Sequence, residues 1–429
     1  MNRRTLNRAG VVTAVGMILL GLLVSTKVNP LHALNLMPDP QTPEEAYSTV
    51  QQPDTVVESQ LVEANTKFGF NLFSEVLKED AGKNVFISPT SVAIALAMTY
   101  NGAAGETQQA MAEALEMQGM SVESLNQANQ VLKASLQNAD PDVQLAIANS
   151  LWANQGVSFK PEFIRRNQQF YQAKLTELDF GMPGAADIIN DWVKENTRNK
   201  IESIVDELTP DHVLFLINAI YFKGNWTDEF DKSRTTEQPF YLADGSQKQH
   251  PLMSQTGKYK YYENEAFQAV SLPYGEERLS LYVFLPRENS NLETFTQQLN
   301  AEQWEQWMLQ FRNRPGSIGL PRFKFEYDIT LNDALKALGM EAAFEAGRAD
   351  FSQMIDTPVN IDEVKHKTFV EVNEEGTEAA AVTSVAVVRT SAQIPEAPFE
   401  MIVNRPFFCA IRDNQTGAVL FMGSIVEPK

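Results

Sequence analysis

The run from Val213 to Phe222 contains nine apolar residues and one polar residue, Asn218, and it restricts the folds open to this chain. A strand with one face in water alternates polar and apolar residues, whereas this run has no such alternation. The run therefore predicts a strand at the centre of a sheet that is covered on both faces. Leu279–Leu285 and Val419–Ile425 are similar and predict further buried strands.

Helical periodicity is concentrated before this run. Apolar residues recur at helical spacing between positions 61 and 76. A second helix should begin with Ser88 as its N-cap and Pro89 in its first turn, and should end near 101–102. Because this helix is apolar nearly all round, it is expected to be buried. Further helices are expected near 105–117, 121–138, 160–173, 185–197 and 292–312.

The order of these elements indicates the fold class. Helices gather in the first half of the chain, strands gather in the second, and Thr368–Val372 alternates as a strand does. Regular alternation of strands and helices would have indicated a doubly wound sheet, so the pattern favours an α+β fold.

The first 60 residues are expected to lie outside the folded body. Residues 1–33 combine a basic start, an uncharged run from Ala9 to Thr26 and a small residue, Ala33, which is the layout of a secretory signal peptide. The same run is long enough to serve as an N-terminal membrane anchor if it is not cleaved. Residues 34–60 read as a disordered, Pro-rich tether. We therefore expect a secreted or periplasmic protein, bound to a membrane only if the first segment is retained.

Charge and cysteine content exclude some classes of partner and bond. A formal net charge of −20 repels phosphate backbones, which argues against nucleic acid. The one cysteine, Cys409, lies in an apolar run and is expected to be a buried structural thiol. No intramolecular disulfide can form, so stability must come from core burial.

Enzyme chemistry is poorly supported. The chain has four histidines, and it lacks zinc, nucleophile-elbow, phosphate-loop and dinucleotide motifs. No pair of carboxylates stands out among its 55 acidic residues. We therefore expect no enzymatic activity, no metal and no cofactor.

The segment 374–395 is the most informative one for function. Alternate positions from Thr377 to Val387 are uncharged and small or β-branched, so this face could enter a sheet without burying a charge. Gly376 at its base is suited to a hinge. Arg389 is the only basic residue between Lys367 and Arg405, and a trypsin-like protease would accept it. A surface loop or edge strand with an isolated arginine is the alternative interpretation.

Dispersed motifs show a resemblance that covers nearly the whole chain. Residues from about 61 to 429 resemble the serpin family, whose motifs occur here in the family's order. They are Asn84-Val85-Phe86-Ile87-Ser88-Pro89, Gly102-Ala103-Ala104-Gly105-Glu106-Thr107, Asn218 through Trp226, His366 through Ala381, and Asn404-Arg405-Pro406-Phe407.

The resemblance implies one serpin domain at 61–429, with three β-sheets, about nine helices and an exposed reactive-centre loop at about 374–395. It implies an inhibitory, prokaryotic member that traps a serine protease as a covalent acyl complex by inserting its cleaved loop into the central sheet. We expect a monomer and a trypsin-like target. A non-inhibitory carrier or chaperone-like protein with the serpin fold is the alternative.

The resemblance also assigns roles to residues. The reactive bond is expected at Arg389–Thr390, with Thr390–Ser391 as the alternative. The hinge would comprise Glu374, Glu375, Gly376, Thr377, Glu378, Ala379, Ala380 and Ala381. Residues that control sheet opening would be Ser88, Ser91, Asn218, Trp226 and His366. The expected helix 121–138 has only Lys133 as a base, so we expect no activation by glycosaminoglycans.

Overall fold

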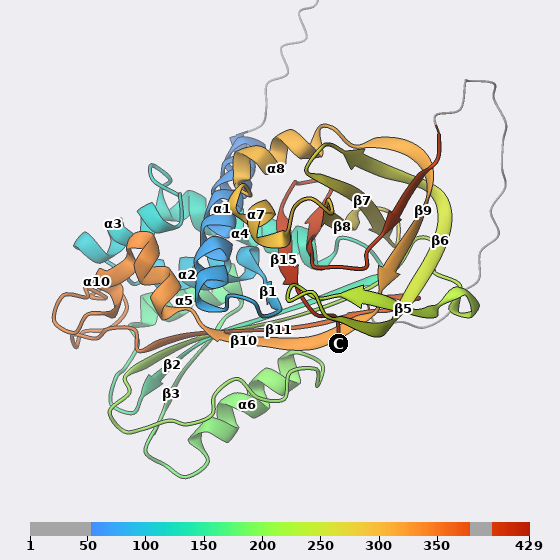
Figure 1. Ribbon diagram of the computed structural model, residues 1–429. Coiled ribbons are helices and arrows are strands. Elements are labelled where there is room, and N and C mark those ends of the chain that lie inside the picture. Colours follow the sequence, from blue (N-terminus) through green and yellow to red (C-terminus); the bar gives the residue numbers. More distant parts are fainter. Residues whose placement is uncertain (1–52, 378–396) are drawn as a thin grey trace, which may run out of the picture. The chain divides into compact units, whose positions relative to one another are not determined.

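The computed structural model describes residues 53–377 and 397–429 (Figure 1). The α-helices of these ranges are α1 (Pro53–Glu79), α2 (Pro89–Tyr100), α3 (Gly105–Ala114), α4 (Val122–Gln137), α5 (Pro161–Tyr171), α6 (Ala185–Asn196), α7 (Leu292–Gln297), α8 (Ala301–Met308), α9 (Asn332–Leu335) and α10 (Glu341–Phe344). Two further short helical turns are η1 (Lys232–Arg234) and η2 (Lys336–Met340).

The strands fall into two hydrogen-bonded sheets. The smaller has the order β10 (Phe323–Thr330), β11 (Glu363–Val372), β4 (Leu214–Asn225), β2 (Val143–Asn154) and β3 (Lys174–Leu178), with β12 (Gly376–Thr377) paired to β4. The larger has the order β1 (Val85–Ile87), β15 (Val419–Ile425), β14 (Phe407–Asp413), β8 (Leu279–Pro286), β7 (Phe267–Tyr274), β6 (Gln247–Glu263), β9 (Arg312–Pro321) and β13 (Phe399–Ile402), with β5 (Thr236–Tyr241) on β6.

The α+β class is confirmed, but the described strands form two sheets where three were expected. The long strand β6 explains the difference, because it pairs with β5 at one end and with β7 at the other. It thereby connects two groups of strands that would otherwise be separate.

Most expected helices are present close to their predicted positions, with two differences. Helix α1 begins at Pro53, so positions 53–60 of the expected tether are helical; proline is tolerated there because first-turn N–H groups have no intrahelical acceptor. The helix expected at 292–312 is two helices, α7 and α8. Asn300 has extended backbone, and its side chain accepts a hydrogen bond from the Gln303 N–H at 2.9 Å, which starts α8 afresh.

Strand β4 is covered on both faces, as its apolar sequence predicts. Phe215, Ile217 and Tyr221 belong to a core cluster shared with α6, while Leu216 and Ile220 belong to the main core. Helix α2 is buried throughout and contacts both β4 and β15, so it fills the space between the sheets. Figure 1 shows α6 on one side of the smaller sheet and α1 and α2 on the other.

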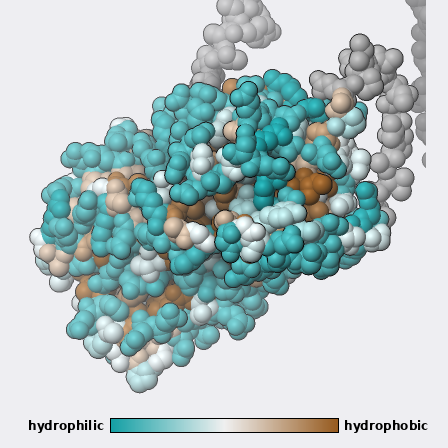
Figure 2. Space-filling view, viewed as in Figure 1, coloured by the Kyte–Doolittle hydropathy of each residue, from teal (hydrophilic) through white to brown (hydrophobic). Residues whose placement is uncertain are grey.

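The surface is mainly hydrophilic on the face shown in Figure 2, where hydrophobic residues form only small areas. Cys409 on β14 is fully buried, and burial raises the pKa of its thiol, so it is the structural thiol that was expected. Within the described ranges, no helix has the length and apolar character required to span a bilayer. The segment 1–33 lies outside those ranges.

Candidate functional site

The centre of the site is the junction between β4 and β11. These parallel strands pair from Phe215 opposite Glu363 to Tyr221 opposite Phe369. Their mutual pairing stops there, although each strand continues for several residues. Beyond that point β12 lies on β4, with Gly376 opposite Asn225 and Thr377 opposite Gly224 in antiparallel register. The two residues of β12 therefore occupy this end of the sheet beside β4.

Four of the five residues expected to control sheet opening lie together behind this junction. His366 on β11 is the direct neighbour of Asn218 on β4, and its Nδ1 lies 2.6 Å from the Asn218 Oδ1. The Asn218 amide donates to the Ser91 hydroxyl at 2.6 Å, and the Ser88 N–H donates to His366 Nε2 at 3.0 Å. We call Ser88, Ser91, Asn218 and His366 the gate cluster. It links α2 to β4 and β11.

The predicted capping role of Ser88 is wrong in one respect. Ser88 is the N-cap of α2, but its hydroxyl makes no capping hydrogen bond and donates instead to the Leu420 carbonyl at 2.6 Å. The side chain thus joins α2 to β15 of the larger sheet, while Pro89 supplies the first helical turn as expected.

His366 must be neutral in this arrangement. Its Nε2 accepts from the Ser88 N–H, which leaves Nδ1 as the donor to Asn218. The ring is fully buried, and this desolvation lowers its pKa to about 3. Protonation would place two donors against each other at Ser88 and a charge between the strands.

Acidification should therefore destabilise the protein through His366. The unfolded chain has the ordinary histidine pKa of about 6.5, so it takes up the proton that the folded state refuses. The stabilisation is complete above that pH, is lost progressively as pH falls toward 3, and amounts to a loss of roughly 2 kcal/mol at pH 5. The urea unfolding midpoints measured at pH 7.5 and at pH 5 should differ more for wild type than for His366→Gln.

His212→Gln serves as the control for this measurement, because His212 is only half buried and lies outside the gate cluster. That variant should keep the wild-type dependence on pH. If His366→Gln also keeps it, the neutral buried imidazole is not the source of the acid sensitivity.

Trp226, the fifth residue, lies at the other end of the junction beside the hinge. Its indole N–H donates to the Asn373 carbonyl at 2.9 Å, and its backbone N–H donates to the Glu375 carbonyl at 3.0 Å. The indole stacks on the Tyr274 ring with centroids 4.5 Å apart. The Phe230 N–H donates to the Glu374 carbonyl at 2.8 Å. The loop after β4 therefore holds the backbone of the hinge.

The described hinge residues make specific side-chain contacts. Glu374 is buried and accepts from Arg322 and Thr235; burial alone would raise its pKa, but these hydrogen bonds hold it below the usual value. Glu375 forms an ion pair with Lys232. The expected residues Glu378, Ala379, Ala380, Ala381, Arg389 and Thr390 lie outside the described ranges.

Thr377 and Gly376 are closely surrounded. The Thr377 hydroxyl lies 3.0 Å from the Tyr274 hydroxyl, and the residue is 1% exposed. Gly376 has φ +144°, and a Cβ at this position would overlap the Gly224 carbonyl oxygen. Only glycine fits where the hinge crosses the end of β4.

Lys133, the single base expected on helix 121–138, is not a surface group. Its Nζ donates to the Tyr171 carbonyl at the end of α5, and burial lowers its pKa to about 8. It therefore serves as a contact between α4 and α5.

Sequence reasoning did not find the partners of these residues. Asn149 on β2 accepts from the Asn218 amide at 2.5 Å. Tyr274 contacts the hinge from β7, and Arg322 contacts it from the position between β9 and β10. The sequence contained one signal, a polar Asn149 within the largely apolar stretch of β2. Tyr274 and Arg322 had no local signal, because their contacts join segments far apart in the chain.

Comparison with known proteins identifies the family. The family model described as Serpin (serine protease inhibitor) matches residues 63–428. A serpin-like protein of Thermococcus kodakarensis is 34% identical over 432 residues, covering 99% of this chain and 100% of its own. Human leukocyte elastase inhibitor is 36% identical and covers 86% of this chain and 100% of its own. Among solved structures, the thermophilic serpin tengpin in its native state is 32% identical, with a TM-score of 0.79, over 88% of this chain and 95% of its own.

The chain belongs to the serpin family, which is described as serine protease inhibitors. The two named relatives come from an archaeon, which is prokaryotic, and from human, so they do not bear out the expectation of a prokaryotic source in either direction.

Proposed function

We propose that this protein inhibits a trypsin-like serine protease by a single-use mechanism. The protease cleaves the reactive loop at Arg389–Thr390, and the freed strand enters the smaller sheet between β4 and β11. Insertion carries the acyl-enzyme away before its ester is hydrolysed, which leaves the protease covalently trapped.

The observation that carries this proposal is the position of β12. Gly376 and Thr377 pair with the last residues of β4, just beyond the point where β4 and β11 stop pairing with each other. A strand that continued from Thr377 along β4 would lie between these two strands. The buried polar bonds of the gate cluster are what such an insertion would have to rearrange.

The proposal predicts a covalent complex with trypsin. Incubation of the full chain with trypsin should give a band near the summed masses that survives boiling in detergent, because the acyl ester is preserved. The measurement is denaturing electrophoresis together with residual trypsin activity. Arg389→Gln is the matched control, since it removes the basic residue and should abolish both cleavage at this bond and the complex.

Cleaved protein without a complex, together with fully active trypsin, would contradict inhibition and favour the carrier or chaperone-like alternative. A complex that persists in Arg389→Gln would place the reactive bond elsewhere in the loop.

We further infer that the protein works outside the cytoplasm as a monomer. The signal-like segment 1–33 supports export, and the retained-anchor alternative would attach the same domain to a membrane. Size measurement and N-terminal sequencing of the protein purified from its natural source test these two inferences.

A further inference from the structure

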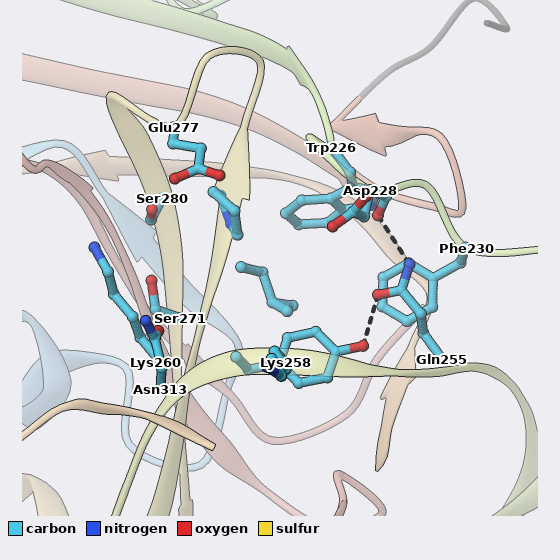
Figure 3. Close-up of a pocket in the computed structure, with 13 residues that line it drawn as sticks. Trp226, Asp228, Phe230, Gln255, Lys258, Lys260, Ser271, Glu277, Ser280 and Asn313 are labelled. Atoms are coloured by element: carbon cyan, nitrogen blue, oxygen red, sulfur yellow. Dashed lines mark hydrogen bonds between the residues drawn. The ribbon is translucent and has the colours of Figure 1, made fainter. Parts of the chain in front are cut away.

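A cavity of about 110 Å³ lies next to the loop that follows β4, on the side of this loop that faces away from the hinge (Figure 3). One wall is this loop, through Trp226, Asp228 and Phe230, and the others come from β6, β7, the start of β8 and β9. An enclosed cavity of roughly 150 Å³ is known to hold benzene, so this smaller space, which is partly open to solvent, can hold one small ring only in part.

The lining combines aromatic and charged groups. Trp226 and Phe230 lie with ring centroids 6.2 Å apart, and Tyr259 contributes a third aromatic wall. Lys258 and Lys260 are exposed on β6 and form no ion pair with any residue in the described ranges. Figure 3 shows Lys260 on the same side of the cavity as Glu277 and Ser280, Asp228 on the other side beside Trp226, and Lys258 between them.

The cavity is connected to the hinge by hydrogen bonds. The Gln255 amide donates to the carbonyls of Asp228 at 3.0 Å and Glu229 at 2.8 Å, and the Tyr259 hydroxyl donates to Gln255 Oε1 at 2.9 Å. The other side of this loop donates to the hinge carbonyls through the N–H groups of Trp226 and Phe230. The loop 226–230 is therefore held between the cavity and the hinge.

We propose that this cavity binds a small molecule with one aromatic ring and one acidic group, and that binding slows the opening of the smaller sheet. The ring lies against Trp226 and Phe230, and the acid lies at Lys258 and Lys260. Asp228 and Glu277 also line the cavity and repel anions, and this repulsion grows with ligand charge, so it disfavours polyanions more than monoanions.

The effect on sheet opening follows from the path of the chain, and this part rests on the proposed function. Strand β4 runs directly into the loop 226–230, so movement of β4 away from β11 moves one wall of the cavity relative to β6. A molecule that fills the cavity binds best to the closed arrangement. It therefore shifts the population toward the closed sheet.

The binding test uses 4-fluorobenzenesulfonate and the full chain, followed by fluorine NMR titration. Wild type should bind it saturably, and Lys258→Gln/Lys260→Gln should bind it about tenfold more weakly or worse, since each charge-assisted contact is lost. Asn313→Trp at the rim should block binding while keeping both lysines, and Lys83→Gln should bind normally. Heparin should not displace the probe. The site would be overturned if the double lysine variant bound the probe as tightly as wild type does. It would also be overturned if wild type bound 4-fluorobenzylammonium as tightly as it binds the probe.

The coupling test measures hydrogen exchange in the loop 226–230, which requires no protease. At a probe concentration ten times its dissociation constant, exchange that needs the cavity to open should slow by up to about tenfold. The yield of trypsin complex should fall and cleaved inhibitor should rise. Binding with unchanged exchange or unchanged complex yield would overturn the coupling. Slowed exchange in a protein that never traps trypsin would instead contradict the proposed function and leave the site standing.

Discussion

Cleavage of the reactive loop should raise the melting temperature of this protein by roughly 20 °C. An inserted strand would pair with β4 on one side and with β11 on the other, in place of the present pairing of β4 with β11. The net gain would be about ten backbone hydrogen bonds, each of which contributes about 1 kcal/mol. For a domain of this size, each kcal/mol added to the free energy of unfolding raises the melting temperature by about 2 °C. The measurement is a thermal scan before and after limited proteolysis.

An ordinary loop would respond in the opposite direction. A break in it increases the entropy of the unfolded chain, so the nicked protein would melt at or below the temperature of the intact one. That result would show that loop insertion does not occur here. Sequencing the released C-terminal fragment also locates the bond: Thr390 as its first residue supports Arg389–Thr390, and Ser391 supports the next bond.

The sequence predicts a helix or strand of this fold well where the burial of that element is visible in the pattern of its own residues. Strand β4 was predicted from its lack of alternation, and the structure explains this, because Phe215 and Leu216 point into different cores. The α2 helix was predicted as buried from its uniform apolar surface, and it lies between two sheets. In both cases burial on all sides leaves a direct mark on composition.

The sequence predicts contacts between distant segments poorly. Nothing near Arg322 indicates that it binds Glu374, and nothing near Tyr274 indicates that its hydroxyl meets Thr377. Ser88 had the local pattern of a capping residue, yet its hydroxyl bonds to Leu420, 332 positions away. Such contacts depend on how the sheets are arranged, and local propensity carries no information about that arrangement.

The family resemblance supplied what local pattern could not, because it named residues that only the fold brings together. Ser88, Ser91, Asn218 and His366 are spread over most of the chain, and they form one hydrogen-bonded cluster. Their contribution to sheet opening remains a prediction. The charge state of His366 follows from geometry alone, because its ring accepts at one nitrogen and donates at the other.

Thr377→Arg should convert the inhibitor into a substrate. Thr377 is 1% exposed, and the variant would place a charge against Tyr274 and Gly224 at a cost of several kcal/mol. The hinge would then leave the sheet, and insertion would be slower than deacylation. Arg389 is untouched, so trypsin should still cleave the loop but should emerge active. The measurement is the yield of detergent-stable complex together with recovered trypsin activity.

Thr377→Val is the matched control for this variant. Valine has the shape of threonine with a methyl group in place of the hydroxyl, so it removes the hydrogen bond with Tyr274 but buries no charge. Trapping should persist in this variant, because an uncharged β-branched side chain still fits the position beside Gly224. If Thr377→Arg traps trypsin with the wild-type stoichiometry, Thr377 does not enter the sheet during inhibition. The register of β12 on β4 would then describe the resting protein but not the path of insertion.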